Sequence, residues 1–314
     1  MRISITDRCN LRCRYCMPEE GIEKVDRSEI LRDEEILRIC HAATNLGINK
    51  FKITGGEPLV RNCCRGLVRS IKELPGCEQV TMTTNGQLLL GNLDELADAG
   101  IDGINISLDT LREDRYRDIT RNGDLKTVIE AVDACISMDI KTKINCLVQR
   151  GVNDDEITDL AEFAMDRGID VRFIELMPIG FADKDRMVSS EEVMEILKTA
   201  YPEMETDRSN HGNGPAVYYK VTGRDGSIGV ISSIHGKFCS GCNRIRLTSK
   251  GFLKPCLCYD EGRNLKPFLD SPIEGLMAVI HDTVTEKPKE HCFESFDNEH
   301  VKSLEKRFMS EIGG

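Results

Sequence analysis

Two groups of three cysteines have the types and spacing to hold a metal centre. The first is Cys9-Asn-Leu-Arg-Cys13-Arg-Tyr-Cys16, directly after a predicted strand, Arg2–Thr6. Structural zinc usually takes four ligands, and a cubane cluster normally takes four cysteines. No histidine or fourth cysteine lies nearby in the sequence. The trio therefore favours an iron–sulfur cluster with one iron left open for catalysis, and the alternative is a zinc knuckle that borrows a distant ligand.

The second group has the spacing C-x2-C-x13-C and consists of Cys239, Cys242 and Cys256. Either His235 or Cys258 could supply a fourth ligand, so zinc stays open on spacing alone. The other interpretation is a second cubane whose open iron binds substrate rather than cofactor. Both trios together indicate two metal centres that each keep a position free.

Basic residues lie within several predicted strands. Arg244 and Arg246 alternate around Ile245, which places both guanidinium groups on one face of a strand. Five more cations lie on four other strands that can converge at one mouth: Arg2, Lys50, Lys52, Lys143 and Arg172. Fixed cations of this kind suit a phosphate ligand. The alternative for Arg244 and Arg246 is a solvated strand edge.

Composition limits the remaining classes of function. The 314 residues carry a net charge of −11, so the chain is a poor general binder of nucleic acid or anionic membrane. No apolar run is long enough to span a bilayer, and no signal-peptide pattern opens the sequence. We therefore expect a cytoplasmic protein. Fourteen cysteines in a reducing compartment indicate metal or catalytic use rather than a disulfide framework.

Six strand-and-helix units must position these residues. The predicted strands are Arg2–Thr6, Lys50–Thr54, Gln79–Thr84, Gly103–Ser107, Lys141–Val148 and Val171–Leu176. The predicted helices are Asp33–Asn45, Arg65–Leu74, Leu93–Ala99, Leu125–Met138, Asp154–Arg167 and Ser190–Ala200. This alternation predicts a parallel sheet with helical crossovers. Six units fall short of a closed eight-unit barrel, which predicts a partial (β/α)6 TIM-type barrel, with a doubly wound open sheet as the alternative.

The pattern changes after Pro202. The segment Ser209–Pro215 is rich in Asn and Gly and predicts a linker. Strands of a smaller unit are predicted at Ala216–Val221, Ser227–Ile234 and Arg244–Thr248, and a helix at Asn298–Ile312. We expect a barrel core over residues 1–208 and a C-terminal α+β extension over 209–314 that carries the second cluster.

The first cysteine motif, with Tyr15 before its last cysteine, strongly resembles the signature of the radical SAM superfamily. Thr54-Gly-Gly-Glu-Pro58 resembles the superfamily segment that holds the methionyl amino group. The resemblance implies that Cys9, Cys13 and Cys16 hold a [4Fe-4S] cluster whose open iron chelates S-adenosyl-L-methionine. The electron from that cluster then yields a 5′-deoxyadenosyl radical. It also implies cofactor contacts for Tyr15, Gly56, Ser107 and Met177.

Further motifs narrow the family. Phe238-Cys-Ser-Gly-Cys-Asn-Arg-Ile-Arg-Leu-Thr248 resembles the C-terminal cluster segment of the GTP 3′,8-cyclase family, which acts in molybdenum cofactor biosynthesis. Arg2–Cys9, Phe173–Gly180 and the terminal Gly313–Gly314 fit the same family, so the resemblance covers nearly the whole chain. It implies that GTP becomes (8S)-3′,8-cyclo-7,8-dihydroguanosine 5′-triphosphate. It also implies a second [4Fe-4S] cluster on Cys239, Cys242 and Cys256, whose free iron meets the guanine.

The same resemblance assigns the remaining roles. Arg244 and Arg246 join the first trio as expected catalytic residues. The implied substrate contacts are Arg2, Lys50, Lys52, Thr83, Lys143, Arg172, Arg244, Ile245 and Arg246. The diglycine tail is expected to reach the active site. Implied partners are a flavodoxin or ferredoxin reductant, cyclic pyranopterin monophosphate synthase as recipient of the product, and a second copy in a homodimer.

This sequence departs from the family pattern at a few positions. Lys52 stands where an arginine is expected, which keeps the charge but loses the bidentate fork. Cys258 and the pair Cys63–Cys64 lie outside the pattern and are interpreted as structural. Two other classes remain open: another auxiliary-cluster radical SAM enzyme, such as a peptide-modifying one, and a non-enzymatic iron–sulfur or zinc protein.

Overall fold

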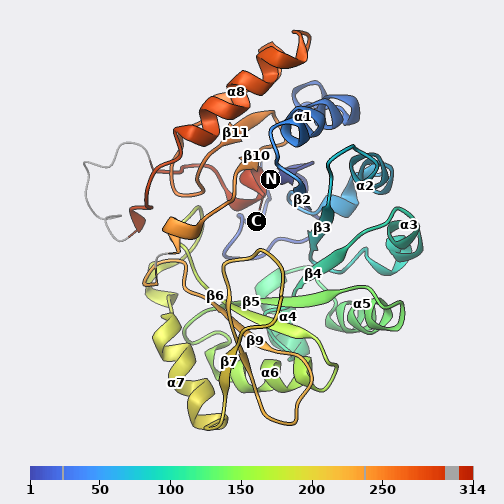
Figure 1. The fold of residues 1–314 in the computed structure, drawn as a ribbon. Helices are drawn as coiled ribbons and strands as arrows, with labels where there is room; N and C mark the ends of the chain where they lie inside the picture. The colour runs from blue at the N-terminus through green and yellow to red at the C-terminus, as the bar shows by residue number, and fades with distance from the viewer. Residues whose placement is uncertain (23–24, 237, 294–303, 314) are drawn as a thin grey trace.

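Six parallel strands form the centre of the molecule, and helices surround them (Figure 1). This computed structural model describes residues 1–22, 25–236, 238–293 and 304–313. The central strands are β1 (Arg2–Ser4), β2 (Lys50–Thr54), β3 (Gln79–Thr84), β4 (Gly103–Ser107), β5 (Thr142–Val148) and β6 (Asp170–Glu175). Each pairs in parallel with the next, so their carboxyl ends meet at one mouth.

The crossover helices form where the sequence supplies start and stop signals. They are α1 (Asp33–Asn45), α2 (Cys64–Lys72), α3 (Leu93–Asp98), α4 (Glu113–Thr120), α5 (Leu125–Ser137), α6 (Ile157–Met165) and α7 (Ser190–Ala200). The side chain of Asp124 accepts a hydrogen bond from the Thr127 amide at the start of α5, and Ser189 forms a capping box with Glu192 at α7. Such caps satisfy amides that have no partner inside the helix.

The C-terminal strands extend the same sheet at both edges. Beyond β6 lie β9 (Ile228–Ile231), β8 (Val217–Lys220) and β7 (Glu205–Asp207), and beyond β1 lie β10 (Arg246–Leu247), β11 (Phe252–Lys254) and β12 (Arg263–Asn264). The two edge strands, β12 and β7, do not pair with each other in the described part of the chain, so the barrel is open. The predicted C-terminal strands do not form a sheet of their own, because β9 and β10 each pair in parallel with a barrel strand.

Side chains alternate across the central strands. Ile3, Ile53 and Met82 belong to one apolar core with residues of the surrounding helices. The intervening positions face the inside of the barrel and are polar: Arg2 pairs with Lys52, and Lys52 pairs with Thr81. Parallel strands are usually apolar on both faces. A polar barrel interior therefore indicates a charged or strongly polar ligand.

The C-terminal part differs most from the sequence-based prediction. A long helix, α8 (Ile273–Thr285), packs on α1 and was not predicted. The expected helix Asn298–Ile312 is wrong over 304–308, where Leu304 pairs with Tyr259, and is confirmed only over α9 (Met309–Ile312). Residues 298–303 of that prediction lie outside the described residues. Figure 1 shows both chain ends at the centre of the barrel.

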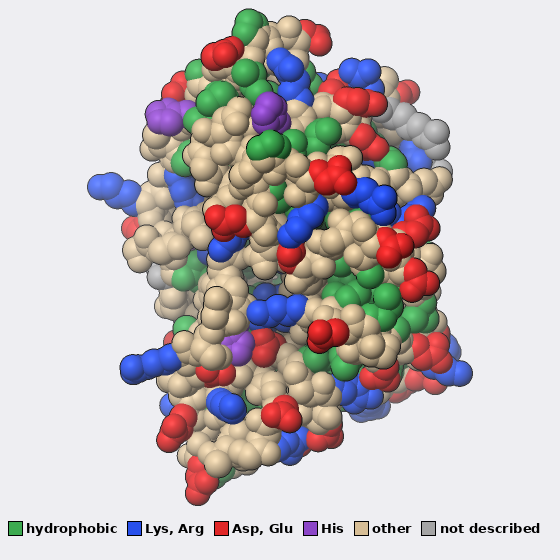
Figure 2. All heavy atoms as spheres, turned by 45° about the vertical axis from the view of Figure 1, so that its right-hand side comes forward, with side chains coloured by type: hydrophobic (Ala, Val, Ile, Leu, Met, Phe, Trp, Pro, Cys, Tyr) green, Lys and Arg blue, Asp and Glu red, His purple; other side chains and the backbone are tan. Residues whose placement is uncertain are grey.

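Two further features concern the surface charge and the character of the helices. On the face shown in Figure 2, acidic and basic side chains are interspersed rather than gathered into a basic patch. Among the described residues, no helix has the length and apolar character needed to cross a membrane.

Candidate cluster and nucleotide site

The first cysteine trio lies in the loop after β1. Cys9, Cys13 and Cys16 are half-buried free thiols. The Leu11 amide donates to Cys9 Sγ at 3.4 Å, and Asn85 Nδ2 approaches the same sulfur at 3.8 Å. Burial raises the pKa of Cys9 to about 11 and that of Cys16 to about 12. Thiols held in this way become thiolates when a cationic metal centre binds, because the metal supplies the missing positive charge.

The spacing of the sulfur atoms favours a cluster over one zinc ion. Thiolates around one tetrahedral zinc lie about 3.8 Å apart, because each Zn–S bond is about 2.3 Å. Among the described residues, only Glu175, Glu191 and His235 have ligand atoms that all lie within 4.8 Å of one another. Neither cysteine trio is that tight. Separate irons of a cubane let thiolates stand farther apart, so both donor sets fit an iron–sulfur cluster.

The two candidate fourth ligands of the second trio are engaged elsewhere. His235 Nδ1 lies 3.2 Å from the buried Glu175 carboxylate, and the Ile234 amide donates to the same group at 2.6 Å. Cys258 Sγ contacts Cys292 Sγ at 3.7 Å. Neither residue completes a four-ligand set with Cys239, Cys242 and Cys256, which matches a centre with an open position.

The segment Thr54-Gly-Gly-Glu-Pro58 holds the first cluster loop in place. The Gly56 amide donates to Thr6 O at 2.7 Å, and the Glu57 amide donates to Arg8 O at 2.8 Å. The buried Glu57 carboxylate accepts from the Asn85 amide at 2.7 Å and from the Thr84 hydroxyl at 2.8 Å. Burial raises the pKa of Glu57 to about 7. Sequence reasoning assigned only Gly56 here and missed Glu57, although the motif contains it.

Replacing Gly56 by alanine is expected to disturb the first cluster. A Cβ atom at this position would lie 2.4 Å from Arg8 O and 2.6 Å from Asp7 O, both backbone atoms. We expect Gly56→Ala to lose about 1–3 kcal/mol of stability and much of the iron of the first cluster, measured by thermal unfolding and by iron analysis of the reconstituted protein. Gly66→Ala is the control, because nothing lies within 4 Å of its added Cβ. Equal iron content in the two variants would contradict the account.

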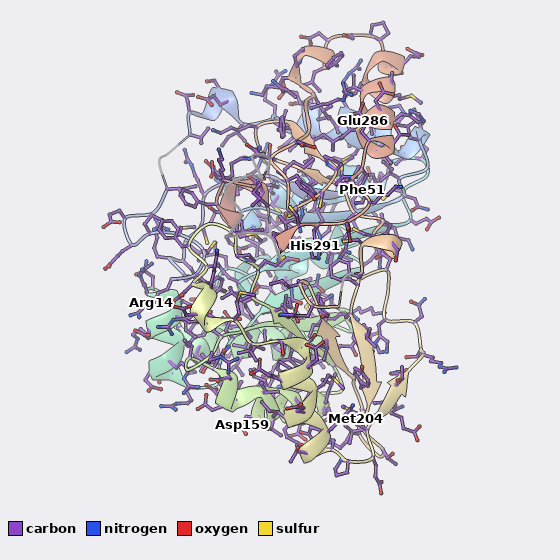
Figure 3. All side chains as sticks on the ribbon, turned by 90° about the vertical axis from the view of Figure 1, so that its left-hand side faces the viewer. Arg14, Phe51, Asp159, Met204, Glu286 and His291 are labelled. Carbon is purple, nitrogen blue, oxygen red and sulfur yellow. The ribbon has the colours of Figure 1, made fainter. Side chains whose placement is uncertain are left out.

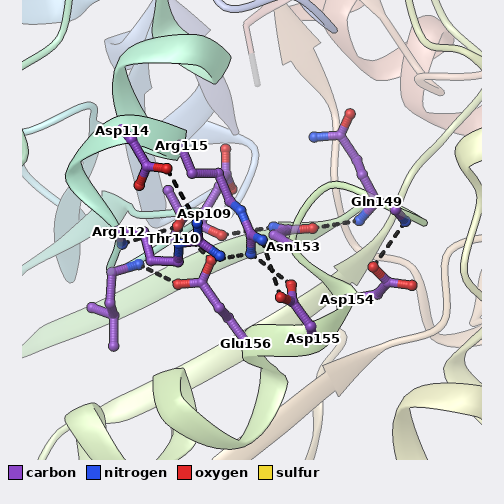
Figure 4. A network of polar contacts seen from close by, with 12 residues as sticks. Asp109, Thr110, Arg112, Asp114, Arg115, Gln149, Asn153, Asp154, Asp155 and Glu156 are labelled. Atoms are coloured by element: carbon purple, nitrogen blue, oxygen red, sulfur yellow. Dashed lines mark hydrogen bonds and ion pairs between the residues drawn. The ribbon is translucent and has the colours of Figure 1, made fainter.

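Tyr15 is anchored by a residue that the sequence did not reveal. Its hydroxyl donates to Asp109 Oδ2 at 2.8 Å, and the Leu147 amide donates to Asp109 Oδ1 at 2.8 Å. Burial raises the pKa of Asp109 to about 6. Figure 4 shows the polar network behind it, in which Asn153 Nδ2 donates to Asp109 O at 2.7 Å. This network fixes the aromatic ring beside the cysteine loop.

Ser107 and Met177 lie at the mouth of the barrel, both half-buried. Ser107 is the last residue of β4, opposite Asn145. Met177 follows β6 and packs on a second apolar cluster of Ile179, Ile234, Cys258, Phe293 and Ile312. Their cofactor contacts stay predictions.

The second trio lies beside cationic side chains. Arg244 donates to Cys242 Sγ at 3.3 Å, and its guanidinium lies 4.4 Å from the centre of the Phe238 ring. Although burial opposes it, the Arg244 amide and guanidinium lower the pKa of Cys242 to about 7. Arg244 precedes β10 instead of lying in it, so the predicted strand Arg244–Thr248 is wrong at its start.

Buried cations line the barrel between the two trios. Arg2 pairs in register with Arg246 on one side and with Lys52 on the other. Burial, Arg246, Arg244 and Arg172 hold the pKa of Arg2 well below its usual value. Burial and the cations Arg172, Arg2 and Lys143 likewise lower the pKa of Lys52. A buried charge without an opposite charge is costly, so the cluster indicates an anionic ligand.

The other predicted contacts differ in their surroundings. The buried Arg172 has no hydrogen-bond partner for its Nε. Lys143 is instead paired with Asp170, and its Nζ donates to Tyr218 Oη at 2.9 Å and His211 O at 2.8 Å. Lys50 is the first residue of β2. Thr83 Oγ1 accepts a hydrogen bond from Asn105 at 3.5 Å. Ile245 is buried. The charge of Lys143 is therefore already balanced by Asp170, so it is the predicted cation least available to a phosphate.

The C-terminal tail enters the barrel beside these cations. Gly313 O accepts a hydrogen bond from Arg246, and Gly313 has φ +76°. A Cβ atom there would lie 2.4 Å from Thr54 Oγ1. Lys254 and Glu305 form a fully buried ion pair that holds the start of the tail. Gly313 therefore contacts Arg246, one of the predicted substrate contacts, and Gly314 lies outside the described residues. That the tail reaches the active site stays a prediction.

Two family models match the chain. The radical SAM superfamily matches residues 3–164, and Molybdenum Cofactor Synthesis C matches residues 169–293. Similar curated proteins include the GTP 3′,8-cyclase of Alkaliphilus oremlandii (strain OhILAs), 45% identical over 318 residues, which cover 100% of this chain and 97% of the relative. The GTP 3′,8-cyclase of Clostridium perfringens (strain 13 / Type A) is 42% identical over 316 residues, with the same coverage.

Solved structures share the fold at low sequence identity. Streptococcus suis SuiB bound to S-adenosylmethionine has a TM-score of 0.63 at 16% identity, covering 92% of this chain and 73% of that one. Native anSMEcpe with bound AdoMet has a TM-score of 0.57 at 17% identity, covering 97% and 92%. These matches confirm the α/β fold with an open, partial barrel.

Proposed function

Because the chain belongs to the GTP 3′,8-cyclase family of radical SAM enzymes, we propose that it cyclises GTP to (8S)-3′,8-cyclo-7,8-dihydroguanosine 5′-triphosphate. One observation of the structure carries the proposal. Arg2 and Lys52, on which no carboxylate acts, lie in the barrel between two cysteine trios, beside Arg172, which has only Asp170 as an opposite charge. A triphosphate supplies the opposite charge that this space lacks.

The first trio and its supports form the cofactor half of the site. Cys9, Cys13 and Cys16 would hold a [4Fe-4S] cluster, which when bound supplies the electron for reductive cleavage of S-adenosyl-L-methionine. Gly56 brings a backbone segment close to the cluster loop. Tyr15, fixed by Asp109, presents its ring beside that loop. Ser107 and Met177 complete the proposed cofactor contacts at the mouth.

The second trio and the cations form the substrate half. Cys239, Cys242 and Cys256 would hold an auxiliary [4Fe-4S] cluster with one iron open to the guanine base. The guanidinium of Arg244 lies against this trio, while Arg246, Arg2 and Lys52 occupy adjacent strands at the barrel wall. Fixed cations hold the triphosphate and so orient the ribose between the two centres, which is the positioning that a reaction at one ribose carbon requires.

The alternative functions fit these side chains less well. A peptide-modifying enzyme with an auxiliary cluster would not need several buried cations without carboxylate partners. A non-enzymatic zinc protein would need a tighter sulfur set than either trio offers. The cation cluster therefore favours a nucleoside triphosphate over a peptide or a purely structural metal.

Anaerobic reconstitution with iron and sulfide tests the proposal. The reduced protein would be incubated with S-adenosyl-L-methionine and GTP, and the products analysed by mass spectrometry. We expect 5′-deoxyadenosine and an isomer of GTP with a new carbon–carbon bond. The proposal would be refuted if GTP did not change the rate of S-adenosyl-L-methionine cleavage and a peptide increased it.

GTP binding is expected to take up protons. Lys52 is held below its ordinary pKa in the free protein and regains a higher pKa beside phosphate oxygens. At a pH between these two values, the bound state therefore carries more protons, and affinity falls as the pH rises above the free-state pKa. Calorimetric titration without S-adenosyl-L-methionine, in two buffers of different ionisation heat, measures the uptake. Proton release would contradict the charge assignment.

The remaining partners follow from the same family. The clusters require an electron donor, for which a flavodoxin or ferredoxin type protein is proposed. The product would pass to cyclic pyranopterin monophosphate synthase in molybdenum cofactor biosynthesis. We also keep as proposals the homodimer, the cytoplasmic location and the division into residues 1–208 and 209–314.

A further inference from the structure

Two cysteines outside both trios lie in contact with each other. Cys258 Sγ and Cys292 Sγ are 3.7 Å apart, and the Cys292 amide donates to Cys258 Sγ at 3.4 Å. Both are free thiols. They come from segments that are 34 residues apart in the sequence, the loop after Cys256 and the stretch after α8. From the sequence, Cys258 is either a possible fourth ligand of the second trio or a structural cysteine, and Cys292 has no predicted role.

The two thiols differ in their access to solvent. Cys258 is fully buried within the second apolar cluster, whereas Cys292 is half-buried at the edge of that cluster. Figure 3 labels His291, the neighbour of Cys292, on the segment that follows α8. A small molecule can therefore reach Cys292 first, with Cys258 directly behind it. An accessible thiol beside a resolving cysteine is the arrangement of reversible redox sites.

We propose that Cys258 and Cys292 form a thiol–disulfide exchange site for low-molecular-weight disulfides, and that its closure ties the auxiliary-cluster loop to the segment after α8. The sulfur atoms need to approach from 3.7 Å to about 2.05 Å, a small movement at the edge of an apolar cluster. In reducing compartments such disulfides are transient and redox-sensing rather than structural.

The exchange balances in two steps. The Cys292 thiolate attacks one sulfur of a small disulfide such as oxidised glutathione, which forms a mixed disulfide and releases one glutathione thiolate. Cys258 then loses its proton and attacks Cys292 Sγ, which forms the protein disulfide and releases the second glutathione. The protein dithiol is oxidised by two electrons, and one oxidised glutathione is reduced to two thiols. Excess reduced glutathione runs both steps backwards.

Cys258 lies close to a proposed ligand of the auxiliary cluster and to the C-terminal tail. Cys258 lies two residues after Cys256, and its carbonyl accepts a hydrogen bond from the Glu305 amide at 2.9 Å. Glu305 in turn pairs with Lys254 at the start of the C-terminal tail. A covalent link at Cys258 therefore constrains both the loop that carries a cluster ligand and the tail that enters the barrel.

Peptide mapping of the oxygen-free holoenzyme tests the proposal. The protein would be treated with oxidised glutathione, alkylated, digested and analysed by mass spectrometry, with iron and sulfide measured in the same sample. We expect a cross-linked peptide pair joining Cys258 and Cys292, reversal by dithiothreitol, and unchanged iron. The exposed Cys63 is the internal control, because its modification shows that the oxidant was active.

Two variants make the result specific. Cys292→Ser removes the half-buried thiol and is expected to abolish the cross-link with the fold retained, and Cys258→Ser is its partner test. Cys77→Ser, at another half-buried cysteine, should leave the cross-link intact. The proposal is overturned by alkylation of both thiols while Cys63 is oxidised, by glutathione that stays on Cys292, or by a link to Cys239, Cys242 or Cys256.

Discussion

Cys256→Ser is expected to abolish cyclisation, by at least about 1000-fold, while the protein keeps its first iron–sulfur cluster. Cys256 is a half-buried free thiol close enough to Cys242 and Cys239 to interact with both electrostatically. With two cysteines left, the auxiliary cluster loses a ligand and the guanine loses its proposed binding position. Iron should fall to about half, and uncoupled cleavage of S-adenosyl-L-methionine should remain detectable.

Cys258→Ser is the matched control for this experiment. It makes the same chemical change two residues away, at a sulfur that contacts Cys292 instead of the trio. Under reducing conditions it should keep the iron content and the cyclisation rate. Full activity of Cys256→Ser, or equal iron loss in both variants, would contradict the ligand assignment.

Lys52→Met is expected to have opposite effects on ligand binding and on the free protein. Methionine keeps the length and apolar stem but removes a charge that is repelled by Arg2, Arg172 and Lys143. GTP affinity should fall about 10- to 100-fold, because a charge-assisted contact to phosphate is lost. The GTP-free protein should unfold at a higher temperature, because a buried charge without a partner has been removed.

Lys52→Arg tests whether charge or shape matters at this position. It keeps the cation and should retain most of the affinity for GTP, with no gain in stability of the free protein. Both variants can be compared by calorimetric titration and thermal unfolding. If Lys52→Met lowered the stability of the free protein and left GTP affinity unchanged, the lysine would be a structural residue rather than a phosphate contact.

Local patterns were sufficient to predict the barrel. The bounds of β2, β3, β4, α1 and α7 agree with the sequence-based prediction, because capping residues and strand periodicity lie within each segment. Helix α4 was missed because most of its residues are charged, with only Tyr116, Ile119 and Thr120 buried. The pairing of β9 and β10 with barrel strands could not be predicted, because it joins segments far apart in the chain, such as β1 and β10.

The residues of the candidate site also divide into those that local sequence patterns predict and those that they do not. Cysteine spacing singled out both trios, and alternation singled out Arg244 and Arg246. The other cations were predicted from their positions on parallel strands that share one mouth. Asp109, Glu57 and the Lys254–Glu305 pair were not found, because each acts through contacts between distant segments: Asp109 with Tyr15, Glu57 with Asn85, and Lys254 with Glu305. A single sequence carries no local signal for such pairs. The ion pair between Lys143 and Asp170 could not be predicted for the same reason.

Mössbauer spectroscopy of protein reconstituted without oxygen tests the central claim most directly. The account predicts two [4Fe-4S] clusters per chain, each with one iron that lacks a cysteine ligand. S-adenosyl-L-methionine should change the signal of one such iron, and GTP should change the other. Zinc in place of the second cluster, or a second cluster whose signal does not respond to GTP, would contradict it.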